Sequence, residues 1–130
     1  MKSKKELKNE YKQLKIQGKK NLSITFLDFI TFKKELDDDE EIIALTTRPI
    51  IRKAYRVCIT KKRILIRPTG IVYEKPNYDI DFKEIYKDSI NYKNATVITF
   101  ETEIEKIEVY DNKSSFFEFL KEKTKDNIKK

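Results

Sequence analysis

The segment YRVCITKKRILIR, at residues 55–67, constrains the fold of this chain more than any other stretch. Two runs rich in β-branched residues flank a short basic turn, and such runs fit the two-residue period of β-strands. With Lys61 and Lys62 as the turn residues, Arg56 lies opposite Arg67 in an antiparallel pairing. The segment therefore predicts a β-hairpin.

The predicted register sorts the hairpin side chains onto two faces. The core face consists of Tyr55, Val57, Ile59, Ile64 and Ile66. The outer face consists of Arg56, Arg63 and Arg67 with Cys58, Thr60 and Leu65. Arg56 opposite Arg67 is a like-charge pair that favours a nearby anion. That anion is either a bound ligand or a carboxylate of a neighbouring strand, such as Asp79 or Asp81, unless the pair is simply solvated.

Helical patterns precede the hairpin, and strand patterns surround and follow it. Apolar residues recur at helical spacing over 3–17, where Gly18 is a plausible end, and an aromatic-rich helix is expected over 25–36. A closing helix is expected over 115–125, with a capping box that begins at Ser115. The expected strands are residues 42–46, 55–60, 63–67, 71–73, 78–82, 89–92, 96–100 and 103–110.

This order of elements predicts an α+β, mainly β protein of about seven antiparallel strands, arranged as a small sandwich or barrel with a helical plug. A chain of 130 residues is normally one domain. We expect a basic helical extension at 1–22, the folded domain at 23–125 and a basic tail at 126–130. Homo-oligomer formation is left open, because the 25–36 helix offers more aromatic surface than a small sandwich covers.

The positive charge of the chain is concentrated at its two ends. The net charge is +7, to which residues 1–20 contribute +6 and residues 121–130 contribute +3, so residues 21–120 carry −2. Basic ends most often serve solubility or weak attraction to polyanions. A nucleic-acid or polyanion binder driven by these lysine-rich ends is therefore the alternative function.

The central part of the chain has a basic stretch of its own. No acidic residue occurs between Glu41 and Glu74. We expect the lysines of the hairpin turn to be a solvent-exposed tip and not an anion site, since water screens them from every side. Arginines on neighbouring strands can converge on one anion at little entropic cost. The predicted binding residues are Arg48, Arg52, Lys53, Arg56 and Arg67.

The sequence lacks the residues that most catalytic and metal sites need. It has no histidine, so the usual general base near neutral pH is missing. The acidic run at 37–41 lacks the alternation and the glycine of a calcium loop, and we expect it to be a solvated loop. Cys58 is expected to be a half-buried packing residue. We expect a protein that is not an enzyme and has no metal or cofactor.

No apolar run approaches the roughly 18 residues of a membrane span, and no apolar stretch follows the first lysines. We therefore expect neither a transmembrane segment nor an export signal. A single cysteine excludes an internal disulfide and favours a reducing compartment. A cytoplasmic location is expected, and a peripheral position at the inner face of the membrane is left open.

The strings ELDDDEEIIAL, YRVCITKKRILI and IDFKEI are similar to bacterial pleckstrin-homology-like domains related to the GRAM group. The resemblance covers residues 36–123. The motif positions of the family are filled here by Glu40 or Glu41, Thr60 with Arg63, and Ile85. The resemblance implies two bent, nearly orthogonal antiparallel sheets closed at one end by the C-terminal helix.

The resemblance also implies a binding or assembly module. In lipid-binding members of this fold, the connection between the first two strands holds the phosphate ligands, and four of the predicted binding residues, at positions 48–56, fall there. The expected partner is a protein or an anionic surface such as lipid headgroups. Nucleic acid is the less favoured partner.

Overall fold

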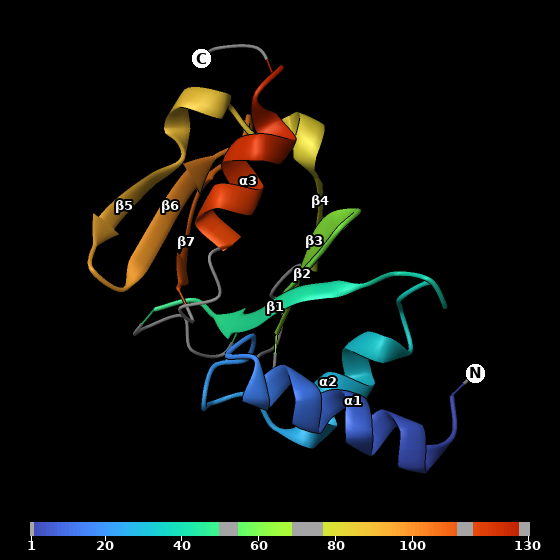
Figure 1. The fold of residues 1–130 in the computed structure, drawn as a ribbon. Helices are drawn as coiled ribbons and strands as arrows, with labels where there is room; N and C mark the ends of the chain where they lie inside the picture. Colours follow the sequence, from blue (N-terminus) through green and yellow to red (C-terminus); the bar gives the residue numbers. More distant parts are fainter. Residues whose placement is uncertain (1, 50–54, 69–76, 112–115, 128–130) are drawn as a thin grey trace.

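The computed structural model describes residues 2–49, 55–68, 77–111 and 116–127. Within them, seven strands form two antiparallel sheets, with two helices before the first sheet and one helix after the second (Figure 1). The expected α+β class with two sheets and a C-terminal helix is confirmed at this level. The elements are α1 (Lys4–Ile16), α2 (Phe26–Lys33), β1 (Ile42–Thr47), β2 (Tyr55–Thr60), β3 (Arg63–Pro68), β4 (Tyr78–Asp81), η2 (Phe82–Glu84), η3 (Lys87–Ser89), β5 (Asn91–Asn94), β6 (Val97–Glu101), β7 (Lys106–Tyr110) and α3 (Phe116–Thr124).

The helices begin and end close to the predicted positions. α1 has Ser3 as its N-cap and is followed by Gly18, whose φ of 70° lies in the left-handed region that glycine adopts readily. α2 is shorter than the expected 25–36, because its last turn opens into the loop that leads to β1. The expected strand at 71–73 and the expected cap at Ser115 lie outside the described residues.

β2 and β3 form the predicted hairpin in the predicted register. Arg56 lies opposite Arg67, and Ile59 lies opposite Ile64. The strand orders are β1-β2-β3-β4 and β5-β6-β7, so neighbours within each sheet are also consecutive in the sequence. The residues predicted to form the core face of the hairpin all belong to the main hydrophobic core, namely Tyr55, Val57, Ile59, Ile64 and Ile66.

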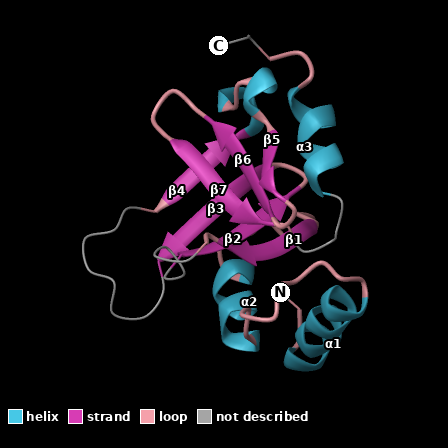
Figure 2. Ribbon diagram, turned by 90° about the vertical axis from the view of Figure 1, so that its left-hand side faces the viewer, coloured by secondary structure: helices cyan, strands magenta, loops and turns pink. Residues whose placement is uncertain are grey.

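The main core lies between the two sheets, and α3 packs against it (Figure 2). Phe116 and Leu120 of α3 are fully buried there. The chain after α3 is tied back by Asn127, whose side-chain amide donates to the carbonyl oxygens of Phe82 and Ile85 at 2.7 Å each. The C-terminal helix is therefore an integral part of the described fold.

A second core covers the opposite face of the four-stranded sheet. Cys58 and Leu65 are fully buried there against Phe29 and Phe32 of α2. We expected this hairpin face to be the outer one, and that expectation is wrong. The apolar side chains between its arginines give the aromatic stripe of α2 a surface to pack on, so both faces of this sheet are buried.

α1 packs beside α2. Hydrogen bonds from α1 and from the α1–α2 connection hold the helix in this position. Leu14 of α1 belongs to the second core, and the Tyr11 hydroxyl donates to the carbonyl oxygen of Ile24 at 2.8 Å. The backbone of Leu45 in β1 then hydrogen bonds with Lys19 and Asn21, at 2.7 and 2.9 Å. Residues 1–22 thus include a helix that is packed on the folded domain, and α1 lies on the outside of the molecule (Figure 1).

Candidate functional site

Three of the five predicted binding residues lie in the described part of the chain, and each of them contacts a carboxylate. These three are Arg48, Arg56 and Arg67, whereas Arg52 and Lys53 lie outside the described residues. The structure brings Arg56 and Arg67 together on neighbouring strands, as predicted. It places Arg48 in a different environment, beside the turn between β6 and β7.

Arg67 uses every donor of its guanidinium group within the protein. Its Nε and Nη2 donate to the carboxylate of Glu35 at 2.8–3.1 Å, and Nη2 also contacts Asp79. Nη1 donates to the carbonyl oxygens of Ile66 and Tyr78. Burial lowers the pKa of Arg67, but the hydrogen bonds to the two carboxylates outweigh burial and raise it. Arg67 therefore stays charged and is held inside the fold.

Arg56 is held by the helix that covers its face of the sheet. Its Nε donates to the Asp28 carboxylate at 3.2 Å, and both side chains are mostly buried. Asp28 also accepts from the backbone N–H of Thr25 and so closes the N-terminal capping box of α2. One carboxylate thus caps the helix and neutralises the arginine beneath it.

Arg48 is buried between the ends of the two sheets. Its Nη2 lies 3.4 Å from Glu105, and its guanidinium lies over the Tyr55 ring. Its Nε is buried and has no hydrogen-bond partner among the residues that the structure describes. Glu105 also accepts from the Tyr78 hydroxyl at 3.1 Å, and burial together with this bond raises the pKa of Tyr78.

Three of the residues that carry the family resemblance meet at one buried carboxylate, while Ile85 lies in the main core. Arg63 donates from Nε and Nη2 to Glu40 at 3.0 and 3.1 Å, and the Thr60 hydroxyl donates to Glu40 at 2.7 Å. Burial raises the pKa of Glu40, but the bonds from Arg63 and Thr60 outweigh it and lower the pKa to about 2. Of the two candidate acids, Glu40 is the buried one, and its carboxylate holds the hairpin turn against the α2–β1 loop.

The rest of the acidic run neutralises the tip of the hairpin. Lys61 pairs with Glu41 at 3.0 Å, and Lys62 pairs with Asp37 and Asp39. Both lysines are about half exposed, which agrees with a wet hairpin end. The expectation that residues 37–41 form a fully solvated loop is wrong for Glu40, because the arginine and hydroxyl donors of the hairpin replace its water.

Asp28 and Glu35, which neutralise Arg56 and Arg67, were not predicted as partners of these arginines. Of the two predicted acids, Asp79 contacts Arg67, while Asp81 caps η2 instead. Most of the carboxylates that pair with the basic stretch belong to α2 and to the loop after it. One signal was available: Asp28 and Glu35 are seven residues apart, which is the spacing of a single helix face.

Positive charge without an internal partner gathers on α1. We name the lysine face by its residues Lys4, Lys5, Lys8, Lys12 and Lys15, which are all exposed. Within the described residues none of the five makes an ion pair, whereas Glu10 on the other flank of the helix pairs with Lys2 and Lys33. Their spacing of three or four residues places them on one side of the helix. The lysine face is the candidate functional site.

The lysine face is followed by exposed apolar side chains. Ile16 lies one turn after Lys12 on the same side of α1 and is 66% exposed. Leu22, in the α1–α2 connection, is 91% exposed, and Leu27 at the start of α2 is 74% exposed. Each of these three apolar side chains therefore has most of its surface in contact with water.

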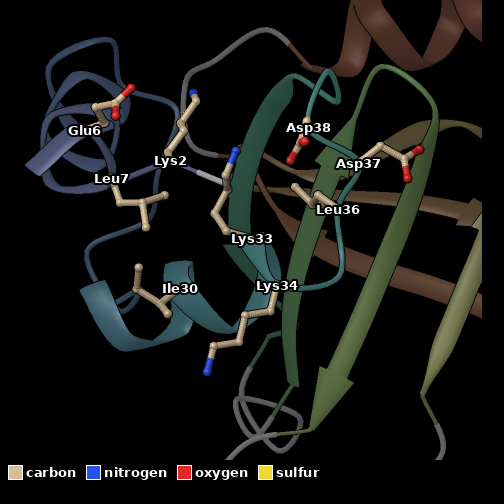
Figure 3. Close-up of a pocket in the computed structure, with 9 residues that line it drawn as sticks. All are labelled: Lys2, Glu6, Leu7, Ile30, Lys33, Lys34, Leu36, Asp37 and Asp38. Carbon is tan, nitrogen blue, oxygen red and sulfur yellow. The ribbon is translucent and has the colours of Figure 1, made fainter. Parts of the chain in front are cut away.

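A cavity of about 310 Å³ lies between the two helices and the α2–β1 loop. Figure 3 shows its apolar residues Leu7, Ile30 and Leu36 set among three lysines and three carboxylates. Lys33 at this cavity already pairs with Glu10. The balance of charge around the cavity gives it no preference for an anion, so we do not place the functional site there.

Within the described residues, the structure shows neither an accessible thiol nor a metal site. Cys58 is fully buried rather than half-buried as expected, and burial raises the pKa of its thiol, so it is no nucleophile. Among the described residues, no group of histidine, cysteine, aspartate and glutamate side chains is arranged to hold a metal ion. No described helix is long and apolar enough to cross a membrane.

Comparisons with protein-family models, with curated proteins and with solved structures gave no match. Over the part of the chain that the structure describes, the protein is an α+β fold with two antiparallel sheets, of four and three strands, and a C-terminal helix. The relation to the GRAM group stays a prediction from the sequence motifs.

Proposed function

We propose that this chain is a non-catalytic interaction module of pleckstrin-homology type that binds anionic membrane surfaces through the lysine face of α1. The succession of a four-stranded sheet, a three-stranded sheet and a closing helix supports this type of fold. The observation that carries the proposed function is the set of five exposed lysines, unpaired within the described residues, on one side of a docked helix.

The proposed binding surface differs from the arginine face expected from the sequence. A ligand at Arg56 or Arg67 would have to displace Asp28 or Glu35 from hydrogen bonds of 3.2 and 2.8 Å. Breaking a largely buried ion pair is costly, because it leaves one charge without its partner. The exposed lysines of α1 carry no such cost, since only water has to be displaced.

The arrangement of the lysine face suits a flat anionic surface. From Lys4 to Lys15 the helix rises about 16 Å, at 1.5 Å per residue. Each lysine near an anionic membrane contributes about 1 kcal/mol of attraction, which decays within a Debye length of about 8 Å at physiological salt. Lysines on one side of a rigid helix reach this range together, whereas lysines on a flexible tail do not.

The exposed apolar side chains favour a membrane over a nucleic acid. Ile16, Leu22 and Leu27 would lose contact with water on entering the headgroup region, and burying apolar surface is favourable at roughly 25 cal/mol per Å². Duplex nucleic acid offers lysines the same phosphate charge but offers these side chains no comparable apolar environment. The combination of basic and apolar groups is typical of interfacial helices.

Vesicle flotation tests the proposal, using phosphatidylcholine vesicles with and without phosphatidylserine. Lys8→Glu with Lys12→Glu should weaken binding to the anionic vesicles at least about tenfold. Lys121→Glu with Lys123→Glu on α3 is the matched control, since it changes the net charge equally and should alter binding less than about twofold. Equal losses in both double variants, or no loss in the first, would overturn the assignment to α1.

A second readout separates the membrane from other polyanions. Leu22→Ser should reduce vesicle binding while leaving any binding to a short DNA duplex unchanged, because only the bilayer buries an apolar side chain. Tighter binding to the duplex than to anionic vesicles, lost in the α1 double variant, would replace the proposal with the polyanion alternative.

A further inference from the structure

A cavity of about 430 Å³ lies on the side of the molecule formed by β4 and the β6–β7 turn, and it shares no residue with α1. It is lined by residues 78–80, 83–86 and 102–105 and by Ile107. We infer that this cavity is a second binding site, one that takes an extended, lysine- or arginine-containing segment of a partner protein. The proposal does not depend on the membrane-binding function.

The first observation is that the cavity lies against a strand edge. β4 ends the order β1-β2-β3-β4 and pairs with β3 alone among the described strands. Tyr78, Asp79 and Ile80 all line the cavity, although successive side chains of a strand point to opposite faces. Three consecutive residues share one cavity only if the cavity borders the edge. Backbone groups at such an edge can pair with an added strand.

The second observation is a fixed, exposed isoleucine on the far wall. Ile104 at the β6–β7 turn is 84% exposed. The Thr102 hydroxyl accepts from the backbone N–H groups of Ile104 and Glu105 at 3.3 Å, and the Thr102 N–H donates to the Glu105 carbonyl oxygen at 3.0 Å. These bonds hold the turn, so Ile104 is presented in a set position toward a segment lying along β4.

The third observation is the charge of the rim, which selects the ligand. Four carboxylates line the cavity, Asp79, Glu84, Glu103 and Glu105, against a single cation, Lys83. Asp79 and Glu105 contact the buried Arg67 and Arg48, whereas Glu103 makes no ion pair within the described residues. A negative rim in a chain of net charge +7 favours a cationic segment locally and disfavours acidic ones.

Together these observations define the chemistry of the ligand. Backbone pairing with β4 requires an extended segment, and its side chains then alternate between two sides. Apolar side chains on one side would contact the exposed Ile104, while basic side chains on the other would approach Glu84 and Glu103. A segment with alternating apolar and basic residues meets both conditions.

Binding of a fluorescent peptide of alternating valine and lysine, measured by anisotropy at physiological salt, tests the site on the full chain. An equally long peptide of valine and glutamate should not bind, because the rim repels it. Ile104→Ser and Glu103→Lys should each weaken binding of the lysine peptide at least about threefold. Tyr92→Ser, on the exposed edge strand β5, is the control and should leave binding unchanged.

Amide chemical shifts of the protein locate the peptide independently. Shifts should change along β4 and at the β6–β7 turn and not along β5. No binding of the lysine peptide, equal binding of the glutamate peptide, or unchanged affinity in both site variants would overturn the proposal. Self-association of the wild-type chain that is lost in Ile104→Ser would also overturn it, because the occupant would then be a second copy.

Discussion

Arg56 and Arg67 lie directly opposite each other on β2 and β3, and a different carboxylate of the α2 region holds each of them. Two like charges in this position cost a few tenths of a kcal/mol to about 1 kcal/mol when nothing compensates them. Here Asp28, from the start of α2, and Glu35, just after its end, supply that compensation. The pair is therefore one means by which the helix is fixed on the sheet.

Removing the partner of Arg67 should destabilise the fold. Glu35→Gln should lower the free energy of unfolding by about 1–2 kcal/mol, which is less than for a fully buried pair because Glu35 is partly exposed and Asp79 still contacts Arg67. Urea unfolding measures this change. Asp38→Asn removes a nearby carboxylate that makes no ion pair within the described residues, and it should change stability by less than about 0.5 kcal/mol. Equal effects of the two substitutions would contradict this role of Glu35.

The buried Glu40 predicts how stability depends on acid. The bonds from Arg63 and Thr60 lower its folded-state pKa from 4.5 to about 2. Since the folded protein binds this proton more weakly than the unfolded chain does, the contribution of Glu40 is complete above pH 4.5 and is lost as the pH falls to about 2. Unfolding free energies measured at intervals across this range should therefore fall with acidification.

The same measurement on Glu40→Gln should give a shallower fall with acidification, because the amide side chain has no proton to bind in this range. Glu41→Gln is the matched control, as Glu41 is about half exposed and, among the described residues, pairs with the exposed Lys61 alone. Its pH dependence should follow that of the wild type. An unchanged slope in Glu40→Gln would show that other groups govern the acid transition.

Packing of α1 on the second core can be measured with two leucines. Leu14 is buried and Leu22 is almost fully exposed. Leu14→Ala should cost about 2–3 kcal/mol of unfolding free energy through lost burial and a residual cavity, whereas Leu22→Ala should cost less than about 0.5 kcal/mol. A fragment of residues 23–130 keeps the main core and the Asn127 hydrogen bonds, so it should melt cooperatively but at a lower temperature than the full chain. A fragment as stable as the full chain would contradict the packing of α1.

Cys58 should behave as a protected core residue. In the folded protein its thiol should react with a disulfide reagent only as fast as the chain opens, because the side chain is fully buried and burial raises its pKa. Cys58→Ser should cost about 1–3 kcal/mol, more than Cys58→Ala, since the serine hydroxyl would be buried among apolar groups. Rapid labelling of the native protein would show that the second core opens readily.

Local patterns in the sequence were sufficient to predict the β2–β3 hairpin but not the helix that packs on its second face. The register of β2 and β3 follows from the turn residues and the two-residue period, which act over a few positions. The covering of Cys58 and Leu65 depends on α2, which is more than twenty residues away in sequence. Two apolar residues among three arginines do not by themselves indicate a buried face, so the second core was missed.

The candidate site shows the same limit. The lysines of α1 are visible in the sequence as a basic helix, and their periodicity was available. Which cations have partners depends on contacts between distant segments: Arg67 with Glu35, and Arg48 with Glu105. Sequence reasoning therefore located basic charge correctly but could not separate neutralised arginines from available lysines.

The burial of both faces of the four-stranded sheet has a consequence for how this chain tolerates mutation. β2 and β3 each contain a run of four buried residues. A substitution at almost any of these positions therefore changes a contact inside the protein. The outer side of α1 and the tip of the β6–β7 turn at Glu103 and Ile104, by contrast, carry exposed side chains. In a saturation mutagenesis screen scored for folding, permissive positions should therefore cluster at these two places. New binding preferences can arise there while the central hairpin stays unchanged.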